Sequence, residues 1–159
     1  MFAVRGKQAS RAIAVVPVLF IASCDSFYGI ESRANVRGPV DIPCVNSVLA
    51  RVPGVGEVTY RRSENRSTEI LPKQREILTV THLWTYGEDG GDILQIDQTP
   101  NGWDYRNARS RMGKAVPHAE IARFQPLMLK VNKAIQSRCG LPVGNLKAKP
   151  VGETKAEEL

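Results

Sequence analysis

The stretch from Glu76 to Tyr86, EILTVTHLWTY, decides the fold because it is the strongest strand signal in the sequence. β-Branched and aromatic residues, which are favoured in strands, make up most of it. Alternate residues of a strand point to the same side, so one face carries an almost apolar row. That row is Leu78, Val80, His82, Trp84 and Tyr86. We therefore expect a strand that packs one face against a core.

Three further segments predict strands next to this one. Val55–Arg62 alternates polar and apolar residues, and Asp92–Gln98 follows a glycine-rich turn at residues 87–91. Asn101-Gly102, a typical hairpin turn, leads into Trp103–Arg111. Turns this short join antiparallel neighbours, so we expect an antiparallel meander of three to four strands.

Helical periodicity appears on both sides of these strands. Residues 41–52 place apolar side chains at steps of three and four. A second pattern starts at Pro117 and extends for about 20 residues toward Gly140, with Pro126 expected to kink the helix or mark a break in it. The order predicts a two-layer α+β domain, in which the meander packs against an N-terminal helix and a long C-terminal helix.

The first 23 residues differ from the rest of the chain. Arg5, Lys7 and Arg11 precede an apolar run over residues 12–22, and no acidic residue occurs before Asp25. A helix needs about 20 apolar residues to span a bilayer, so this run is too short for a permanent anchor. A basic start, a short apolar segment and small residues at its end predict a secretory signal over residues 1–23.

The end of this segment, Ile21-Ala22-Ser23-Cys24, resembles the lipobox of bacterial lipoproteins, with Ile where Leu is commoner. In that family a diacylglycerol is attached to the cysteine thiol, and the peptide bond before the cysteine is cut. The resemblance implies a lipid on Cys24 and a protein anchored in the cell envelope, facing the periplasm. Asp25 resembles the retention signal of inner-membrane lipoproteins, with the outer membrane as the alternative. An ordinary secreted protein cut near Ser23 remains the alternative to lipidation.

The chain has three cysteines, and an odd number in an exported protein needs an explanation. If Cys24 carries the lipid, Cys44 and Cys139 remain as a pair. A pair in an oxidising compartment predicts a disulfide. The alternatives are a buried free thiol or a metal ligand, although no His or further Cys lies at ligand spacing.

The chain after the signal divides into three predicted parts. Residues 24–40 would hold the lipidated cysteine and a flexible tether, because they mix Gly, Ser, Asn and Pro without apolar periodicity. Residues 41–144 would form the single α+β domain, and residues 145–159 a disordered tail. The formal net charge is +6, but without the three basic residues of the signal 19 basic and 16 acidic residues remain. This near balance argues against a nucleic-acid partner.

The sequence contains no constellation that predicts catalysis, a metal site or a cofactor. His82 shares a strand face with Val80 and Trp84, where a hydrogen-bonded structural histidine is commoner than a catalytic one. His118 lies in the first turn of the second predicted helix, without another histidine at the spacing of a metalloprotease helix. We therefore expect a protein that is not an enzyme.

Arg106, Arg109 and Arg111 form the one cluster that suggests a contact surface. Together they would face an anionic surface or an acidic envelope protein. The alternative is an ordinary solvated surface, or a charged edge that prevents strand pairing.

These observations favour a non-enzymatic envelope lipoprotein, which is held to the membrane by its N-terminal lipid and displays a small disulfide-closed domain to another envelope component. The alternative is a periplasmic ligand-binding or inhibitory lipoprotein with a groove between sheet and helices. A pocket lined by His82, Trp84 and Trp103 would favour the alternative, and a polar sheet face would favour the first hypothesis.

Overall fold

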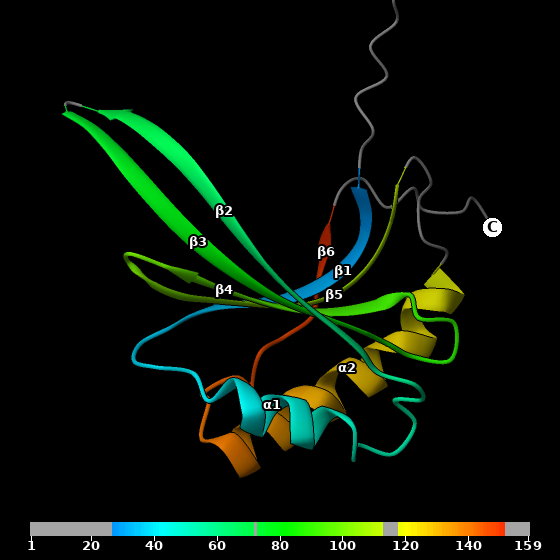
Figure 1. Cartoon of the computed structure of the whole chain (residues 1–159). Helices are drawn as coiled ribbons and strands as arrows, with labels where there is room; N and C mark the ends of the chain where they lie inside the picture. The colour runs from blue at the N-terminus through cyan, green and yellow to red at the C-terminus, as the bar shows by residue number, and fades with distance from the viewer. Residues whose placement is uncertain (1–26, 72, 113–117, 152–159) are drawn as a thin grey trace, which may run out of the picture.

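The computed structural model describes residues 27–71, 73–112 and 118–151, which form one antiparallel sheet with two helices packed on one of its faces (Figure 1). The strands are β1 (Phe27–Val36), β2 (Thr59–Leu71), β3 (Lys73–Tyr86), β4 (Asp92–Thr99), β5 (Gly102–Met112) and β6 (Lys149–Val151). The helices are α1 (Ile42–Leu49) and α2 (His118–Cys139).

The sheet has six strands in the order β2-β3-β4-β5-β1-β6, so the prediction of a meander of three to four strands is wrong. Strands β2 to β5 pair in chain order, and β1 and β6 extend the sheet beyond β5. The two additional strands come from the segments predicted as a flexible tether and a disordered tail. The architecture is still broadly α+β, but much more of the chain is strand than expected.

Strand β1 forms because a long partner is available, and its own sequence gives little sign of it. It pairs with β5 over its whole length, from Phe27 opposite Met112 to Val36 opposite Trp103. The side chains of β1 that face the helices are Ile30, Ser32, Ala34 and Val36. A row with a serine and an alanine in its middle has no apolar alternation, so periodicity alone does not reveal this strand.

The core lies between the sheet and the helices. The strands supply large buried side chains, including Trp84, Tyr86, Leu94, Ile96 and Tyr105. The helices supply Val45, Leu49, Val131 and Ile135. Trp84 Nε1 donates to Asn46 Oδ1 at 3.1 Å, which fixes the indole against α1 while its ring stays fully buried.

Local sequence sets the ends of both helices. Asp41 is the N-cap of α1 and its Oδ1 accepts from the backbone N–H of Cys44 at 2.9 Å. Pro126 lies inside α2, as expected, and Gly140 follows its last residue with a φ of 71°. Positive φ suits glycine at the end of a helix. The predicted start of this helix, Pro117, is outside the described residues.

The disulfide predicted from cysteine counting is present between Cys44 and Cys139. Their Cα atoms are 5.9 Å apart and the sulfurs 2.11 Å apart. The bond joins the first turn of α1 to the last residue of α2, so it fastens the two helices together at one end of the helical layer.

Strands β2 and β3 extend well past the other strands. β4 pairs with β3 only between Val80 and Tyr86, whereas β2 and β3 pair along their full lengths. Residues 65–71 of β2 and 73–79 of β3 therefore form a two-stranded projection, which we call the arm (Figure 1). It lies at the opposite end of the strands from the start of β1.

Candidate interaction surface

The sheet face opposite the helices is a candidate interaction surface, which we call the open face. In the described part of the chain both helices cover the other face (Figure 1). Representative side chains of the open face are Arg33, Thr81, Leu83, Gln95, Asp97 and Arg106. Most of them are half-buried, because neighbouring strands shield their stems while their ends stay accessible.

Hydrogen bonds hold the side chains at the centre of the open face. Thr81 Oγ1 donates to Asp97 Oδ1 at 2.6 Å, and Gln95 Nε2 donates to Asp97 Oδ2 at 2.7 Å. Thr81 and Asp97 are directly opposite each other on β3 and β4. Both carboxylate oxygens are thus occupied, and the surface is fixed before any partner binds, which lowers the entropic cost of binding.

A second pair orders the side of the open face formed by β5 and β1. Arg106 Nε donates to Glu31 Oε2 at 2.7 Å, with side chains only 25% and 21% exposed. Asn35 Nδ2 donates to Asp104 Oδ1 at 3.1 Å on the same two strands. The face therefore combines both signs of charge in fixed positions, and it is not a single basic patch.

A cavity of about 340 Å³ opens on this face where the arm leaves the sheet. Its lining combines polar side chains with a few apolar contacts: Asn35, Arg75, Ile77, Thr79, Thr99, Pro100, Asn101 and Asp104. Amides, hydroxyls, one guanidinium and one carboxylate converge there, which suits a small polar molecule or a polar side chain of a partner.

Arg106 and Arg109, two members of the predicted basic patch, do not share a surface. Arg106 lies on the open face, but Arg109 points to the helical side and is 2% exposed. Residues separated by an odd number of positions lie on opposite faces of a strand. A regular strand therefore could not place Arg106 on the same face as Arg109. The side chain of Arg111 is outside the described residues.

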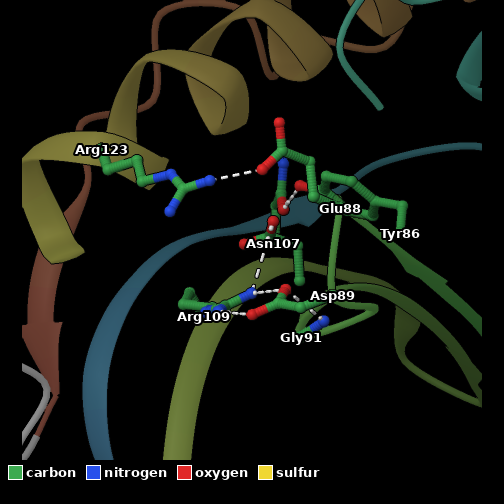
Figure 2. A network of polar contacts seen from close by, with 8 residues as sticks. Tyr86, Glu88, Asp89, Gly91, Asn107, Arg109 and Arg123 are labelled. Carbon is green, nitrogen blue, oxygen red and sulfur yellow. Dashed lines mark hydrogen bonds and ion pairs between the residues drawn. The ribbon is translucent and has the colours of Figure 1, made fainter. Parts of the chain in front are cut away.

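Arg109 belongs to a buried polar network between the sheet and α2 (Figure 2). Its two terminal nitrogens donate to the two carboxylate oxygens of Asp89 at 2.7 and 2.5 Å, and Nη1 is 3.7 Å from Asp92 Oδ2. Its guanidinium lies 3.6 Å from the ring centroid of Phe124, a cation–π contact. A Cβ at Gly91 would overlap Arg109 Nη1, so a side chain there would require the guanidinium to move.

The same network continues through amides and phenols. Tyr86 Oη donates to Asn107 Oδ1 at 2.5 Å, while Asn107 Nδ2 and Tyr105 Oη donate to Asn132 Oδ1 at 2.8 and 2.7 Å. Burial raises the pKa of both phenols far above the usual value, so they remain neutral donors. These bonds link β3 and β5 to α2 and give partners to groups that would be costly to bury alone.

His82 has the structural environment that its strand face predicts. Its Nδ1 lies 2.8 Å from Tyr60 Oη, and its ring is 7% exposed and stacks with Tyr60, Trp84 and Trp103. Burial lowers the pKa of His82, with a further contribution from Arg62. The His82 ring thus packs against Trp84 and Trp103, the residues whose pocket would have favoured a ligand-binding protein, and Trp84 itself is fully buried and hydrogen-bonded to α1. The side chain of His118 is outside the described residues.

The buried network contains a charge pair, Asp92 and Arg109, that the sequence analysis did not predict, although the sequence contains a signal for it. Asp92 precedes Leu94 and Ile96 on the same alternating row of a predicted strand. A carboxylate on an inward-facing row needs a buried cationic partner, because an unpaired buried charge is too costly. Asp92 and Arg109 are directly opposite each other on β4 and β5.

Comparisons with protein-family models, curated proteins and solved structures gave no match to this chain. None of the helices in residues 27–71, 73–112 and 118–151 is long and apolar enough to cross a membrane. Within those same ranges there is no group of three or more His, Cys, Asp or Glu side chains suited to hold a metal ion.

Proposed function

We propose that this chain is an exported, non-enzymatic envelope lipoprotein, anchored by a lipid on Cys24, that binds another envelope component through the open face of its sheet. The observation that carries this proposal is the disulfide between Cys44 and Cys139. Disulfides persist in oxidising compartments, which supports export. With these two cysteines paired, the thiol that follows the apolar run is the remaining one, and lipidation gives it a use.

The position of β1 sharpens the proposal, because it replaces a long tether with a short connection. Cys24 precedes Phe27, the first residue of β1, by three positions. Three residues span at most about 11 Å, so the sheet would begin close to the lipid. The open face could then reach no farther from the membrane than the length of the folded domain. The partner would therefore lie near the same membrane.

The open face supports binding more than catalysis. Its side chains are fixed by the Thr81–Asp97–Gln95 and Arg106–Glu31 contacts, and they present alternating donors, acceptors and apolar groups. A patterned surface of this kind gives specificity for a partner with complementary charges. His82, which is buried, packs against the rings of Tyr60 and Trp103.

Two measurements on protein from native membranes test the proposal. Intact-mass spectrometry should find a diacylglyceryl group on Cys24, and Cys24→Ser should give unprocessed or released protein. A photo-crosslinking residue at Gln95, on the open face, should capture a partner that the same probe at Lys133, exposed on α2, does not. An unacylated N-terminus would refute the anchor, and equal capture at both positions would refute the open face.

A second candidate function, binding of a small polar ligand, is favoured by the 340 Å³ cavity. Thr79→Trp would fill that cavity from the middle of its lining. Native mass spectrometry of the protein purified from its own membranes should show a co-purified small molecule that is lost in this variant. Absence of such a species from the unmodified protein would leave the protein-binding hypothesis alone.

A further inference from the structure

Strand β2 is a long edge of the sheet, and none of the described strands covers it. It extends over 13 residues, and within residues 27–71, 73–112 and 118–151 it pairs only with β3, because the sheet order begins with β2. Every side chain from Thr59 to Thr68 is exposed. An edge strand presents unpaired backbone N–H and C=O groups that can accept another strand, and most proteins keep such edges short or blocked.

The charges on this edge are arranged so that the strand complements itself. β2 reads TYRRSENRSTEIL, and its charged residues are Arg61, Arg62, Glu64, Arg66 and Glu69. In an antiparallel pair of two copies centred on Asn65, Glu64 of each copy lies opposite Arg66 of the other. The two-fold axis therefore gives the interface two pairs of opposite charge. Opposite charges directly across two strands are favourable.

Other registers are less favourable. Centring the pair on Glu64 places Glu64 opposite itself and Arg62 opposite Arg66. Centring it on Arg66 places two arginines face to face. A pair centred on Ser63 avoids like charges but overlaps only from residue 59 to residue 67. Registers between these, in which one copy slides by a single residue, would place side chains of opposite faces next to each other. The register at Asn65 alone combines the full strand length with no like-charge pair.

Two ion pairs within each chain are already placed to join such an interface. Arg62 Nη2 lies 2.6 Å from Glu64 Oε1, and Arg66 Nη1 lies 3.4 Å from Glu76 Oε1. All four residues lie on the helical side of the sheet. Pairing about Asn65 would bring Glu64 of one copy beside Arg66 of the other and link the ion pairs into rows of alternating charge. Rows of this kind are stronger than isolated surface pairs.

We propose that two copies of this chain associate through antiparallel pairing of their β2 strands about a two-fold axis at Asn65, forming one continuous sheet. The dimer does not depend on the lipid anchor, but it is compatible with it. At the average twist of roughly 20–25° per step, the four steps from β2 to β1 would turn β1 toward the direction of the two-fold axis. The axis then directs the β1 ends of both copies toward the same side.

Cysteine crosslinking of the full chain tests the register. Residue 65 would lie opposite itself, within the distance that a disulfide spans, so Asn65→Cys should give a covalent dimer under mild oxidation. Ser63→Cys is the matched control on the same face. In the proposed register two residues at position 63 are displaced by four positions along the strands and cannot be bridged. Equal crosslinking of both variants, or of neither, would overturn the proposal.

A charge exchange tests the same interface without any covalent bond. Glu64→Arg places arginines opposite each other at two sites, and it should weaken the dimer at least about tenfold in sedimentation measurements on the detergent-solubilised full chain. Glu64→Arg combined with Arg66→Glu should restore it, and Glu57→Arg, outside β2, should leave it unchanged. A monomer at all concentrations, or an exchange that does not restore binding, would overturn the proposal, as would β2 crosslinks to a different protein in place of a second copy. Circular dichroism should show that all variants are folded.

Discussion

The part of the sheet that packs against α1 and α2, which we call the covered end, differs from the arm in how its charged residues are placed. Under α2 the side chains of Arg109 and Asp92 are 3% and 2% exposed, whereas Arg66 and Glu76 on the arm are 69% and 64% exposed. The buried pair is surrounded by further hydrogen bonds and a ring contact. The exposed pair is a single contact in water. Burial therefore decides what a charge pair contributes, since removal of one buried partner leaves an uncompensated charge.

This difference indicates which part of the molecule is scaffold and which is available for binding. The covered end is fixed by the disulfide, the aromatic core and the network around Arg109. The arm has two strands, and neither α1 nor α2 of the described chain is drawn over it in Figure 1. A two-stranded ribbon gains little stability of its own. We expect substitutions at the covered end to change the free energy of unfolding, and substitutions on the arm to change association.

The largest expected effect comes from the disulfide that closes the helical layer. Replacing both cysteines, Cys44→Ser with Cys139→Ser, removes a crosslink that spans 95 residues of sequence. The unfolded chain then regains loop entropy, and the free energy of unfolding should fall by about 4–5 kcal/mol in urea titrations. Reduction of the unmodified protein should give the same loss. A loss below 1 kcal/mol would show that the covered end does not depend on this bond.

The second-largest loss of stability is expected for Arg109 and not for Arg106, although both were predicted to belong to one basic patch. Arg109→Met leaves Asp89 and Asp92 without their guanidinium, and it should lower the free energy of unfolding by about 3–5 kcal/mol. Arg106→Met, on the open face, should cost no more than about 1 kcal/mol, because its pair with Glu31 is partly solvated. Equal losses in urea titrations would remove the distinction between the two faces.

These two residues also show where sequence analysis succeeds and where it fails. Alternation places Trp84 and Tyr86 on one row of a strand, and the structure buries that row. Grouping Arg106 with Arg109 ignored the same rule, since side chains three positions apart in a strand point to opposite faces. The disulfide could be predicted because counting cysteines needs no geometry.

The number of strands could not be predicted, for a physical reason. β1 has no apolar alternation: Ser32 faces the helices, where its Oγ lies 3.3 Å from Met128 Sδ, and its small size lets α2 approach. What makes β1 a strand is its pairing with β5, whose residues lie 67 to 85 positions further along the chain. β6 depends in turn on β1, with only three residue pairs. Long-range pairing overrides local preference in both cases.

A smaller, pH-dependent effect is expected at the boundary between the covered end and the arm. Burial and Arg62 lower the pKa of His82 below its value of 6.5 in the unfolded chain, with Asp97 acting in the opposite direction. The folded state therefore prefers neutral His82, and its contribution is complete above pH 6.5 and is lost as the pH falls through the lowered pKa. Unfolding measured between pH 7 and 5 should show this loss.

Two variants test whether His82 causes this pH dependence of stability. His82→Gln should flatten the curve between pH 7 and 5, whereas Tyr60→Phe should remove the hydrogen bond to Nδ1 but keep the curve. Hydrogen bonding by Arg109 lowers the pKa of Asp89, so the contribution of Asp89 is complete above the ordinary carboxyl pKa of 3.8 and is lost as the pH falls from there through the lowered pKa. An unchanged slope in His82→Gln would assign the pH dependence to another group.

The smallest change in the free energy of unfolding is expected for a substitution on the arm. It tests directly whether the arm contributes less to stability than the covered end. Glu76→Ala removes the 3.4 Å ion pair with Arg66, and because both side chains are mostly exposed the free energy of unfolding should change by less than about 0.5 kcal/mol. The measurement needs dilute protein, so that association through β2 does not contribute. At high concentration the same variant should lose part of its dimer, because Glu76 ends the proposed row of alternating charge. A loss of stability in dilute solution as large as that of Arg109→Met would mean that the arm is scaffold, and the contrast between the two regions would fail.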